Sequence, residues 1–239
     1  MSPLAFAMLA ALGNLIGALV VVRHARREMS VIELFVAFGA GFMASAVILG
    51  MLPEAFARAG DAPLYVLAGF LAVHLAQHVL TPHFHFGEET HRVSASAGVS
   101  ALLGLSLHTF FDGVAIASGF LVSSELGVLV FLAVFLHKLP EGVTMASVML
   151  AGGQGSRRAL AAAAGLGAAT VLGVLLTGVA APLAAHGLAL SAGVTLYVAA
   201  SNLVPEFQAK RGWATAVAFF GGAGAFLVTR ILLSGWLPR

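Results

Sequence analysis

The chain has 239 residues, of which 60% are hydrophobic and 9% are charged, and its mean hydropathy is +1.00. A soluble domain usually has about a quarter of its residues charged, so this chain has too few to cover a water-facing surface. The composition excludes a soluble protein and predicts a membrane protein whose first partner is the lipid bilayer. The basic residues, although they raise the isoelectric point to about 9.5, are scattered through short loops, which argues against a nucleic-acid partner.

Length and loop signals predict the number of helices. A membrane-spanning helix needs roughly 20 residues, so the chain has room for about eight spans. Gly, Pro and polar residues mark the connections between the apolar segments. We predict an all-α, polytopic membrane helix bundle that forms a single transmembrane domain over residues 1–239. The predicted helices are residues 4–22, 31–56, 64–80, 95–120, 127–150, 158–181, 187–207 and 213–236.

The basic residues also predict the orientation. Short loops rich in Lys and Arg stay in the cytoplasm. The first apolar run has no basic residue before it, so we expect a first span and not a secretory signal. The loops on one side contain more basic residues than those on the other, so they are expected in the cytoplasm. Both termini are then expected outside, in a protein of the cytoplasmic (plasma) membrane. The basic side contains Arg23, Arg26, Arg27, Arg92, Arg157, Arg158, Lys210 and Arg211, and the opposite side contains Arg58, Arg230 and Arg239.

Two pairs of segments are similar to each other. SLHTFFDGVAIAS (106–118) aligns with FLHKLPEGVTMAS (135–147), and MLPEAF (51–56) is similar to LVPEF (203–207). In the predicted topology the members of each pair cross the membrane in opposite directions. This pattern indicates a 3+2+3 inverted repeat, an arrangement typical of transporters with a site near the midplane.

Ionisable residues lie in the middle of the fourth and fifth predicted spans. A charged group there costs at least about 2.5–3.5 kcal/mol, so it needs a partner, a cavity or an ion. His108 and Asp112 are four residues apart and share one helix face, as do His137 and Glu141. Two imidazoles and two carboxylates form a donor set suited to Zn²⁺. The alternative is a pair of structural His–carboxylate contacts, but the repeated spacing favours a metal site. Cysteine is absent from the sequence, which excludes thiolate ligands.

These motifs resemble the ZIP (Zrt-/Irt-like) family of divalent-metal transporters. HTFFDG (108–113) and HKLPEG (137–142) are similar to the signatures of the family's fourth and fifth helices. The resemblance implies eight spans, outward termini, a homodimer and uptake of a divalent metal, zinc first, toward the cytoplasm. It also implies that the four ligands of the primary metal site are His108, Asp112, His137 and Glu141.

Three departures from the family pattern concern a second metal ion found in some members. Thr109 replaces the usual Asn, Lys138 stands where binuclear members have an acid, and the helix over 158–181 contains no Asp or Glu. A lysine ammonium can occupy the place of the second cation. We therefore predict a site for one metal ion, with Lys138 as the charge substitute.

Other polar residues suggest a path for the ion. Glu54 lies near the outer end of the second span, although a helix-end carboxylate in water is nearly as good an explanation. Toward the cytoplasm, we expect an exit formed by two pairs with the same four-residue spacing. These are His74 with His78 and Asn202 with Glu206. The loop over 81–92 is interpreted either as a metal-gathering segment or as a plain solvated connection, and its candidate ligands are His83, His85, Glu88, Glu89 and His91.

Two rival functions use the same metal site. An intramembrane zinc-dependent hydrolase needs an open metal position and usually an HExxH-like helix, which the sequence does not contain. A non-transporting metal sensor would bind the ion without moving it. We predict a transporter and not an enzyme.

Overall fold

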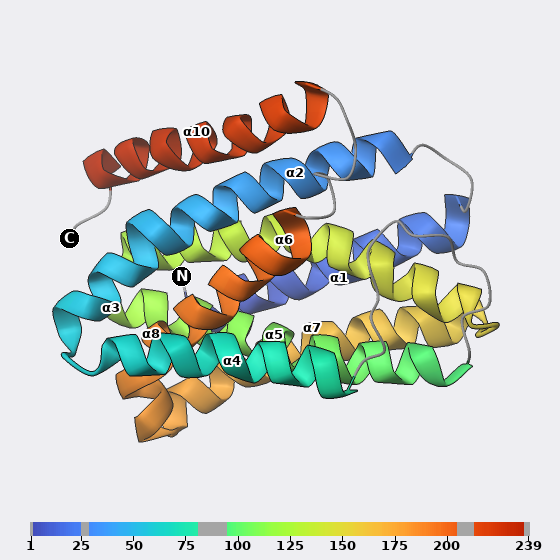
Figure 1. Cartoon of the computed structure of the whole chain (residues 1–239), viewed down its shortest axis with the longest axis horizontal. Coiled ribbons are helices and arrows are strands. Elements are labelled where there is room, and N and C mark those ends of the chain that lie inside the picture. Colours follow the sequence, from blue (N-terminus) through green and yellow to red (C-terminus); the bar gives the residue numbers. More distant parts are fainter. Residues whose placement is uncertain (1, 25–28, 81–94, 205–212, 237–239) are drawn as a thin grey trace.

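The computed structural model describes residues 2–24, 29–80, 95–204 and 213–236, and throughout these ranges the regular elements are helices (Figure 1). This confirms the all-α prediction. The elements are α1 (Pro3–His24), α2 (Met29–Ser45), η1 (Ala46–Met51), α3 (Leu52–Arg58), α4 (Ala62–Leu80), α5 (Ala95–Val122), α6 (Ser124–Ala151), α7 (Ser156–Val179), α8 (Ala181–Tyr197), η2 (Val198–Leu203) and α10 (Trp213–Trp236).

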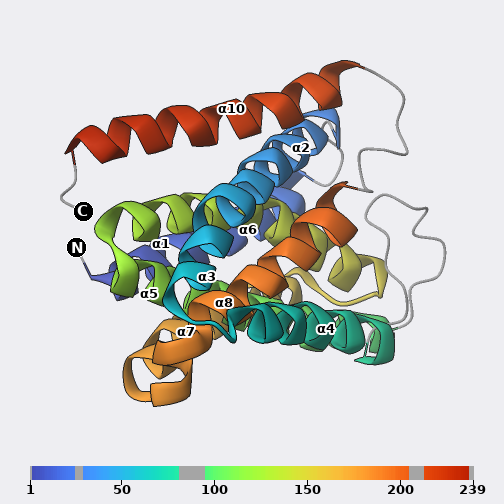
Figure 2. The same ribbon diagram turned by 60° about the vertical axis from the view of Figure 1, so that its left-hand side comes forward.

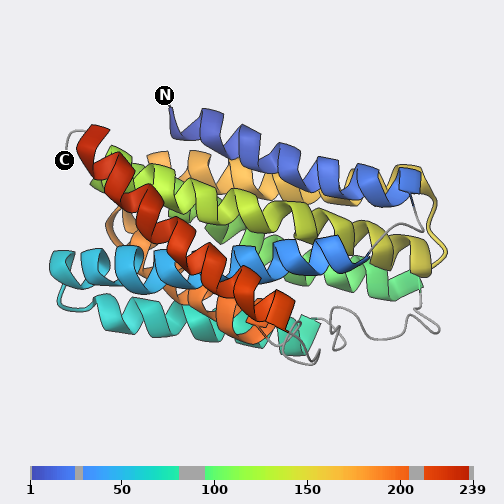
Figure 3. The same ribbon diagram turned by 90° about the horizontal axis from the view of Figure 1, so that it is seen from above.

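The helices correspond to the eight predicted spans. Seven described segments are long and apolar enough to cross a membrane, and α4 is apolar over Ala62–Gln77, the part with described side chains. The second span consists of α2, η1 and α3 in succession, and the seventh consists of α8 followed by η2. In Figure 3 most of the helices run along one long axis, α10 crosses them obliquely, and α1 begins at the end where α10 ends.

One predicted boundary is wrong. The segment before Gly187 was expected to be a connection, but α8 already begins at Ala181. Pro182 occupies the first turn of this helix, where a backbone N–H has no helical partner and proline is therefore tolerated. A proline near a predicted boundary can start a helix as well as separate two helices.

Four pairs of helices approach so closely that only glycine fits at the contact. In each pair, a glycine on one helix faces the backbone of the other, and a second glycine faces back. A methyl group at any of these positions would overlap a backbone carbonyl of the partner helix. The pairs are Gly17 with Gly142 (α1 and α6), Gly113 with Gly173 (α5 and α7), Gly41 with Gly222 (α2 and α10), and Gly69 with Gly193 (α4 and α8).

These contacts follow the inverted repeat. The repeat relates the first span to the sixth (α1 to α7) and the second to the seventh (α2 to α8). It likewise relates the third to the eighth (α4 to α10) and the fourth to the fifth (α5 to α6). It therefore converts the α1–α6 contact into the α5–α7 contact, and the α2–α10 contact into the α4–α8 contact. The pairs α1–α6 and α5–α7 also pack against each other, α1 on α7 and α5 on α6, and form one four-helix group. The remaining long helices are α2, α4, α8 and α10. Figure 2 shows α10 next to α2 at one edge and α4 at the opposite edge, next to the start of α8.

A second feature shared by the two halves is a π-helical turn. The turns η1 and η2 each have a proline two residues after their last residue, Pro53 and Pro205, of which Pro205 lies outside the described residues. Pro53 has no N–H to donate to the carbonyl of Leu49, four residues earlier. This carbonyl instead accepts a hydrogen bond of 2.8 Å from Nη1 of Arg230 on α10. Isolated π-turns inside helices are frequent at functional sites.

Replacing Gly173 by alanine should destabilise the protein, because the new methyl group would overlap the carbonyl oxygen of Phe110 on α5. Overpacking of this kind typically costs about 1–3 kcal/mol. Gly178→Ala is the matched control, since Gly178 lies on the same helix with open space around it. Thermal unfolding of the two variants in detergent tests the close packing of α5 on α7. Equal midpoints for the two variants would contradict it.

Candidate metal centre

The two predicted ligand pairs meet between α5 and α6. A short turn at Ser123 joins these helices, so they run in opposite directions and their midpoints lie beside each other. All four side chains are at most 4% exposed. One ligand atom from each of His108, Asp112, His137 and Glu141 lies within 4.8 Å of the other three. The structure therefore brings together the four residues that the sequence singled out.

The distances between these atoms suit a small tetrahedral ion. Two ligands that are each about 2.0–2.1 Å from Zn²⁺ in a tetrahedron are about 3.3 Å apart. Nε2 of His137 is 3.2 Å from Oδ2 of Asp112 and 3.9 Å from Oε2 of Glu141. Nε2 of His108 is 3.6 Å from Oε2 of Glu141. Small side-chain shifts would bring these separations to the tetrahedral value.

The two histidines are held differently. Nδ1 of His137 lies 3.0 Å from the carbonyl oxygen of Ala133, one turn earlier on α6. A carbonyl can only accept, so Nδ1 donates this hydrogen bond and Nε2 is directed to the ligand cluster. Nδ1 of His108 is buried and has no hydrogen-bond partner within the described ranges. The ring of His137 is therefore fixed in advance by its Nδ1 hydrogen bond, whereas the ring of His108 has, among the described residues, only the polar contact of Nε2 with Glu141.

Lys138 takes part in the same cluster. Its side chain is fully buried, and Nζ lies 2.7 Å from Oδ2 of Asp112 and 2.7 Å from Oε2 of Glu141. Nζ also donates to Oγ1 of Thr109 at 3.2 Å, so its three N–H groups all have acceptors. Thr109 in turn donates to Oε1 of Glu141 at 2.6 Å. The ammonium thus contacts the same two carboxylate oxygens that face the imidazoles.

Residues 88–230 match the family model described as ZIP Zinc transporter, which covers more than half of the chain. The chain belongs to the ZIP family. No curated protein matches the sequence. ZIP proteins are transporters of divalent metals and not enzymes, so the hydrolase alternative is set aside. The buried cluster on α5 and α6 is a place in this ZIP protein where such an ion could be held.

Three of the residues predicted to line the ion path, Glu54, His74 and Asn202, have described side chains in this ZIP protein. Glu54 is paired with Arg58 at 3.0 Å in an exposed position at the end of α3. His74 is exposed on α4, and its ring packs edge-on against Tyr197, with ring centroids 5.7 Å apart. Asn202 is half-buried in η2. Glu206, the side chain of His78 and the whole loop over 81–92 lie outside the described residues. The roles of all these residues in transport stay predictions.

Sequence reasoning did not single out Asn14. This residue is fully buried on α1 and lies against Gly142, which follows the predicted ligand Glu141 in sequence. Neither polar atom of its side-chain amide has a partner within the described part of the chain. The signal was available, since an amide in the middle of an otherwise apolar span is costly unless it is satisfied.

Proposed function

We propose that this ZIP protein transports Zn²⁺ across the plasma membrane toward the cytoplasm, through the four-ligand site on α5 and α6. In this proposal both termini face outward, as the charges of the loops imply. The protein works as a homodimer, as the family resemblance implies. The observation that carries the proposal is the convergence of the four ligand atoms, all within 4.8 Å and all buried at mid-span.

The donor set supports zinc over harder ions. Two imidazole nitrogens and two carboxylate oxygens suit a borderline divalent cation, whereas Mg²⁺ and Ca²⁺ favour sites built from oxygen alone. Fe²⁺, Co²⁺, Mn²⁺ and Cd²⁺ are the competitors that a transport assay must rank.

The position of Lys138 supports a single metal ion. With both carboxylates ionised and the lysine protonated, the formal charges of the metal-free cluster are −2 and +1, which sum to −1. Binding of one Zn²⁺ changes this sum to +1, and a second divalent ion would raise it to +3 in a buried site. Such an excess of positive charge is unfavourable at low dielectric. In this proposal the lysine stands in for the second cation that some family members bind.

The two helix groups supply a basis for alternating access. The proposed ligands all belong to α5 and α6, which pack on each other. The close glycine contacts Gly17–Gly142 and Gly113–Gly173 join α6 to α1 and α5 to α7, and α1 packs on α7, so the four helices form one group. The remaining helices, taken as the second group, are joined by the same kind of contact in two pairs, α2 with α10 and α4 with α8, and the pairs meet where η2 lies against α2. In the proposed cycle the ligand-bearing group moves as a unit against the second group and exposes the site first outward and then inward.

Zinc flux into proteoliposomes tests the proposal. We expect the wild-type protein to admit zinc and the His137→Ala variant to admit almost none, because His137 is the imidazole held in place for the ion. His186→Ala is the matched control, since His186 stacks on Tyr65 at a centroid distance of 3.9 Å, away from the four ligands. Repeating the assay with the other divalent ions and an imposed pH gradient ranks the substrates.

Two outcomes would contradict the proposal. Full flux in His137→Ala would show that the cluster on α5 and α6 is not the transport site. Zinc binding by the wild-type protein without any flux, in vesicles where the protein is correctly folded, would favour the sensor alternative.

A further inference from the structure

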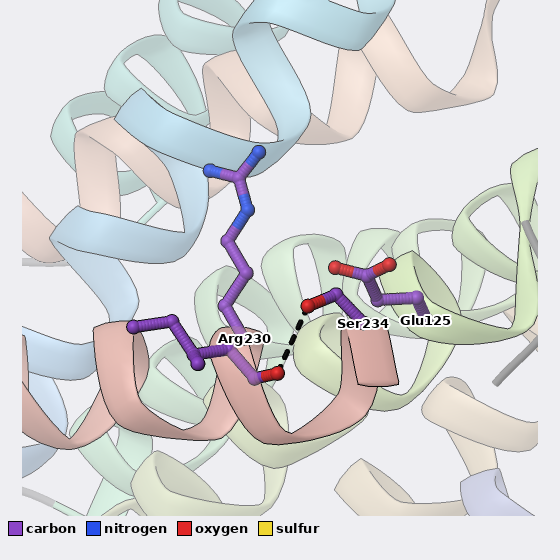
Figure 4. A pocket seen from close by; sticks show the side chains of 4 residues that line it. Glu125, Arg230 and Ser234 are labelled. Atoms are coloured by element: carbon purple, nitrogen blue, oxygen red, sulfur yellow. Dashed lines mark hydrogen bonds between the residues drawn. The ribbon is translucent and has the colours of Figure 1, made fainter. Parts of the chain in front are cut away.

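A hollow lies at the end of the bundle where α1 begins and α10 ends, far along α5 and α6 from the metal centre. Its volume is about 440 Å³, within the range of small-molecule sites, and it is lined by Glu125, Arg230, Ile231 and Ser234. A second hollow of about 140 Å³ shares Glu125 and Arg230 and extends to Glu54. Figure 4 shows Arg230 and Glu125 projecting from different helices on either side of this space.

The two charged residues of the hollow have opposite signs and do not neutralise each other. Nη1 of Arg230 donates to the carbonyl of Leu49, which fixes the guanidinium and leaves its other N–H groups for a ligand. Glu125 lies in the first turn of α6, and its carboxylate has no ion pair or hydrogen bond within residues 2–24, 29–80, 95–204 and 213–236. The other acid at this end, Glu54, is already paired with Arg58. The hollow thus offers one cationic and one anionic partner.

The surroundings indicate a lipid as the source of the ligand. The α10 face beside the hollow is strongly apolar, with Val228, Ile231 and Leu232 all more than half exposed. In a membrane-spanning helix such a face contacts acyl chains. Arg230 and Ser234 lie in the last two turns of α10, at the level where a membrane helix meets the lipid headgroups. A phospholipid lying along α10 would therefore place its headgroup at this hollow.

We propose that the hollow binds the headgroup of a phospholipid that has both a phosphate and a primary ammonium, the phosphatidylethanolamine type. Arg230 binds the phosphate through charge-assisted hydrogen bonds, and Glu125 accepts hydrogen bonds from the ammonium. A choline headgroup has no N–H to donate to Glu125. An anionic glycerol headgroup places no cation there and leaves the carboxylate unpaired. The charge pattern of the site is thus matched to one headgroup chemistry.

The bound headgroup also connects the two helix groups. Glu125 belongs to α6 in the ligand-bearing group, and Arg230 belongs to α10 in the other group. A headgroup that contacts both residues holds the groups together at this end of the bundle. The site itself does not depend on the transport proposal, because it is defined by its own charges and by its apolar border.

Native mass spectrometry of the purified full-length protein tests the assignment. Phosphatidylethanolamine, phosphatidylcholine and phosphatidylglycerol with identical acyl chains are added at equal concentration, and retained lipid is counted. We expect about tenfold greater retention of phosphatidylethanolamine, in line with a hydrogen-bonded charge pair. Glu125→Gln should remove the preference over phosphatidylcholine, and Arg230→Gln should weaken retention of all three lipids. Arg157→Gln, an equal change of charge at the exposed start of α7, should leave the preference unchanged.

The experiment has clear contrary outcomes. Equal retention of the three lipids by the wild-type protein, or an unchanged preference in Glu125→Gln, would overturn the proposal. Displacement of the lipid by soluble glycerophosphoethanolamine at a comparable concentration would overturn the assignment to a membrane lipid. Arg230→Lys is the control for misfolding of Arg230→Gln. It keeps a cation for the phosphate and should retain the preference for phosphatidylethanolamine. Because the measurement is lipid retention and not zinc flux, it is independent of the proposed transport function.

Discussion

Replacing Lys138 by glutamine should raise the affinity of the central site for zinc by at least about tenfold and should destabilise the metal-free protein. The ammonium is the group that neutralises the buried carboxylates of Asp112 and Glu141, at 2.7 Å from each. Removing one partner of a buried ion pair typically costs roughly 3–5 kcal/mol, because the remaining charge is left uncompensated. Bound zinc restores this charge compensation in the variant, so part of the lost stability returns as free energy of zinc binding. A return of only about 1.4 kcal/mol is enough for a tenfold gain in affinity.

Thermal unfolding with and without zinc measures both effects at once. We expect the metal-free variant to unfold at a lower temperature than the metal-free wild type. We also expect zinc to raise the unfolding temperature of the variant by more than it raises that of the wild type. Lys138→Arg keeps the positive charge and should fall much closer to the wild type. We also expect slower zinc flux in Lys138→Gln, because an ion held more tightly is released more slowly. Identical metal dependence in Lys138→Gln and the wild type would contradict the role of the ammonium as a competing cation.

The ligand cluster could be predicted from sequence because its geometry is mostly local. A spacing of four residues places His108 with Asp112, and His137 with Glu141, on single helix faces whatever the rest of the fold does. The short connection at Ser123 then forces the two helices to be antiparallel neighbours. Apolar surroundings made each ionisable side chain conspicuous, because charge in a membrane span has few explanations. The number and type of the elements followed from the same contrast between apolar and polar segments.

Other features depend on contacts between distant segments, and sequence spacing does not specify these. Lys138 follows His137 directly and so points about 100° away from it on an ideal helix, yet its long side chain reaches back to both carboxylates. From sequence, Arg230 is only a basic residue near a helix end. In the structure it donates a hydrogen bond to the carbonyl of Leu49, 181 positions earlier, which Pro53 leaves without its usual N–H donor. The reciprocal glycine contacts were equally hidden, since glycine is common throughout this chain.

Replacing Asp112 by asparagine should weaken zinc binding by at least about 100-fold, the largest loss that we expect from a single substitution of nearly equal shape. Substitutions of groups that merely support metal ligands often cost 10–100-fold in affinity, and Asp112 is a direct ligand in the proposed site. The variant also leaves the Lys138 ammonium with one carboxylate instead of two. With zinc bound, the formal charges of Glu141, Lys138 and the ion sum to +2, compared with +1 in the wild type. Isothermal titration of the purified variant with zinc measures the loss.

A second substitution separates the two causes of this loss. If excess positive charge contributes, Asp112→Asn combined with Lys138→Gln should bind zinc more tightly than Asp112→Asn alone, because the formal charge of the loaded site returns to +1. The double variant should still bind more weakly than Lys138→Gln, since the oxygen ligand lost with Asp112 is not replaced by a neutral amide of equal strength. Residues in direct contact usually show such non-additive energies. A double variant that binds no better than Asp112→Asn would show that Lys138 acts on zinc only through the position of the Asp112 carboxylate, and that its charge has no separate effect on the ion.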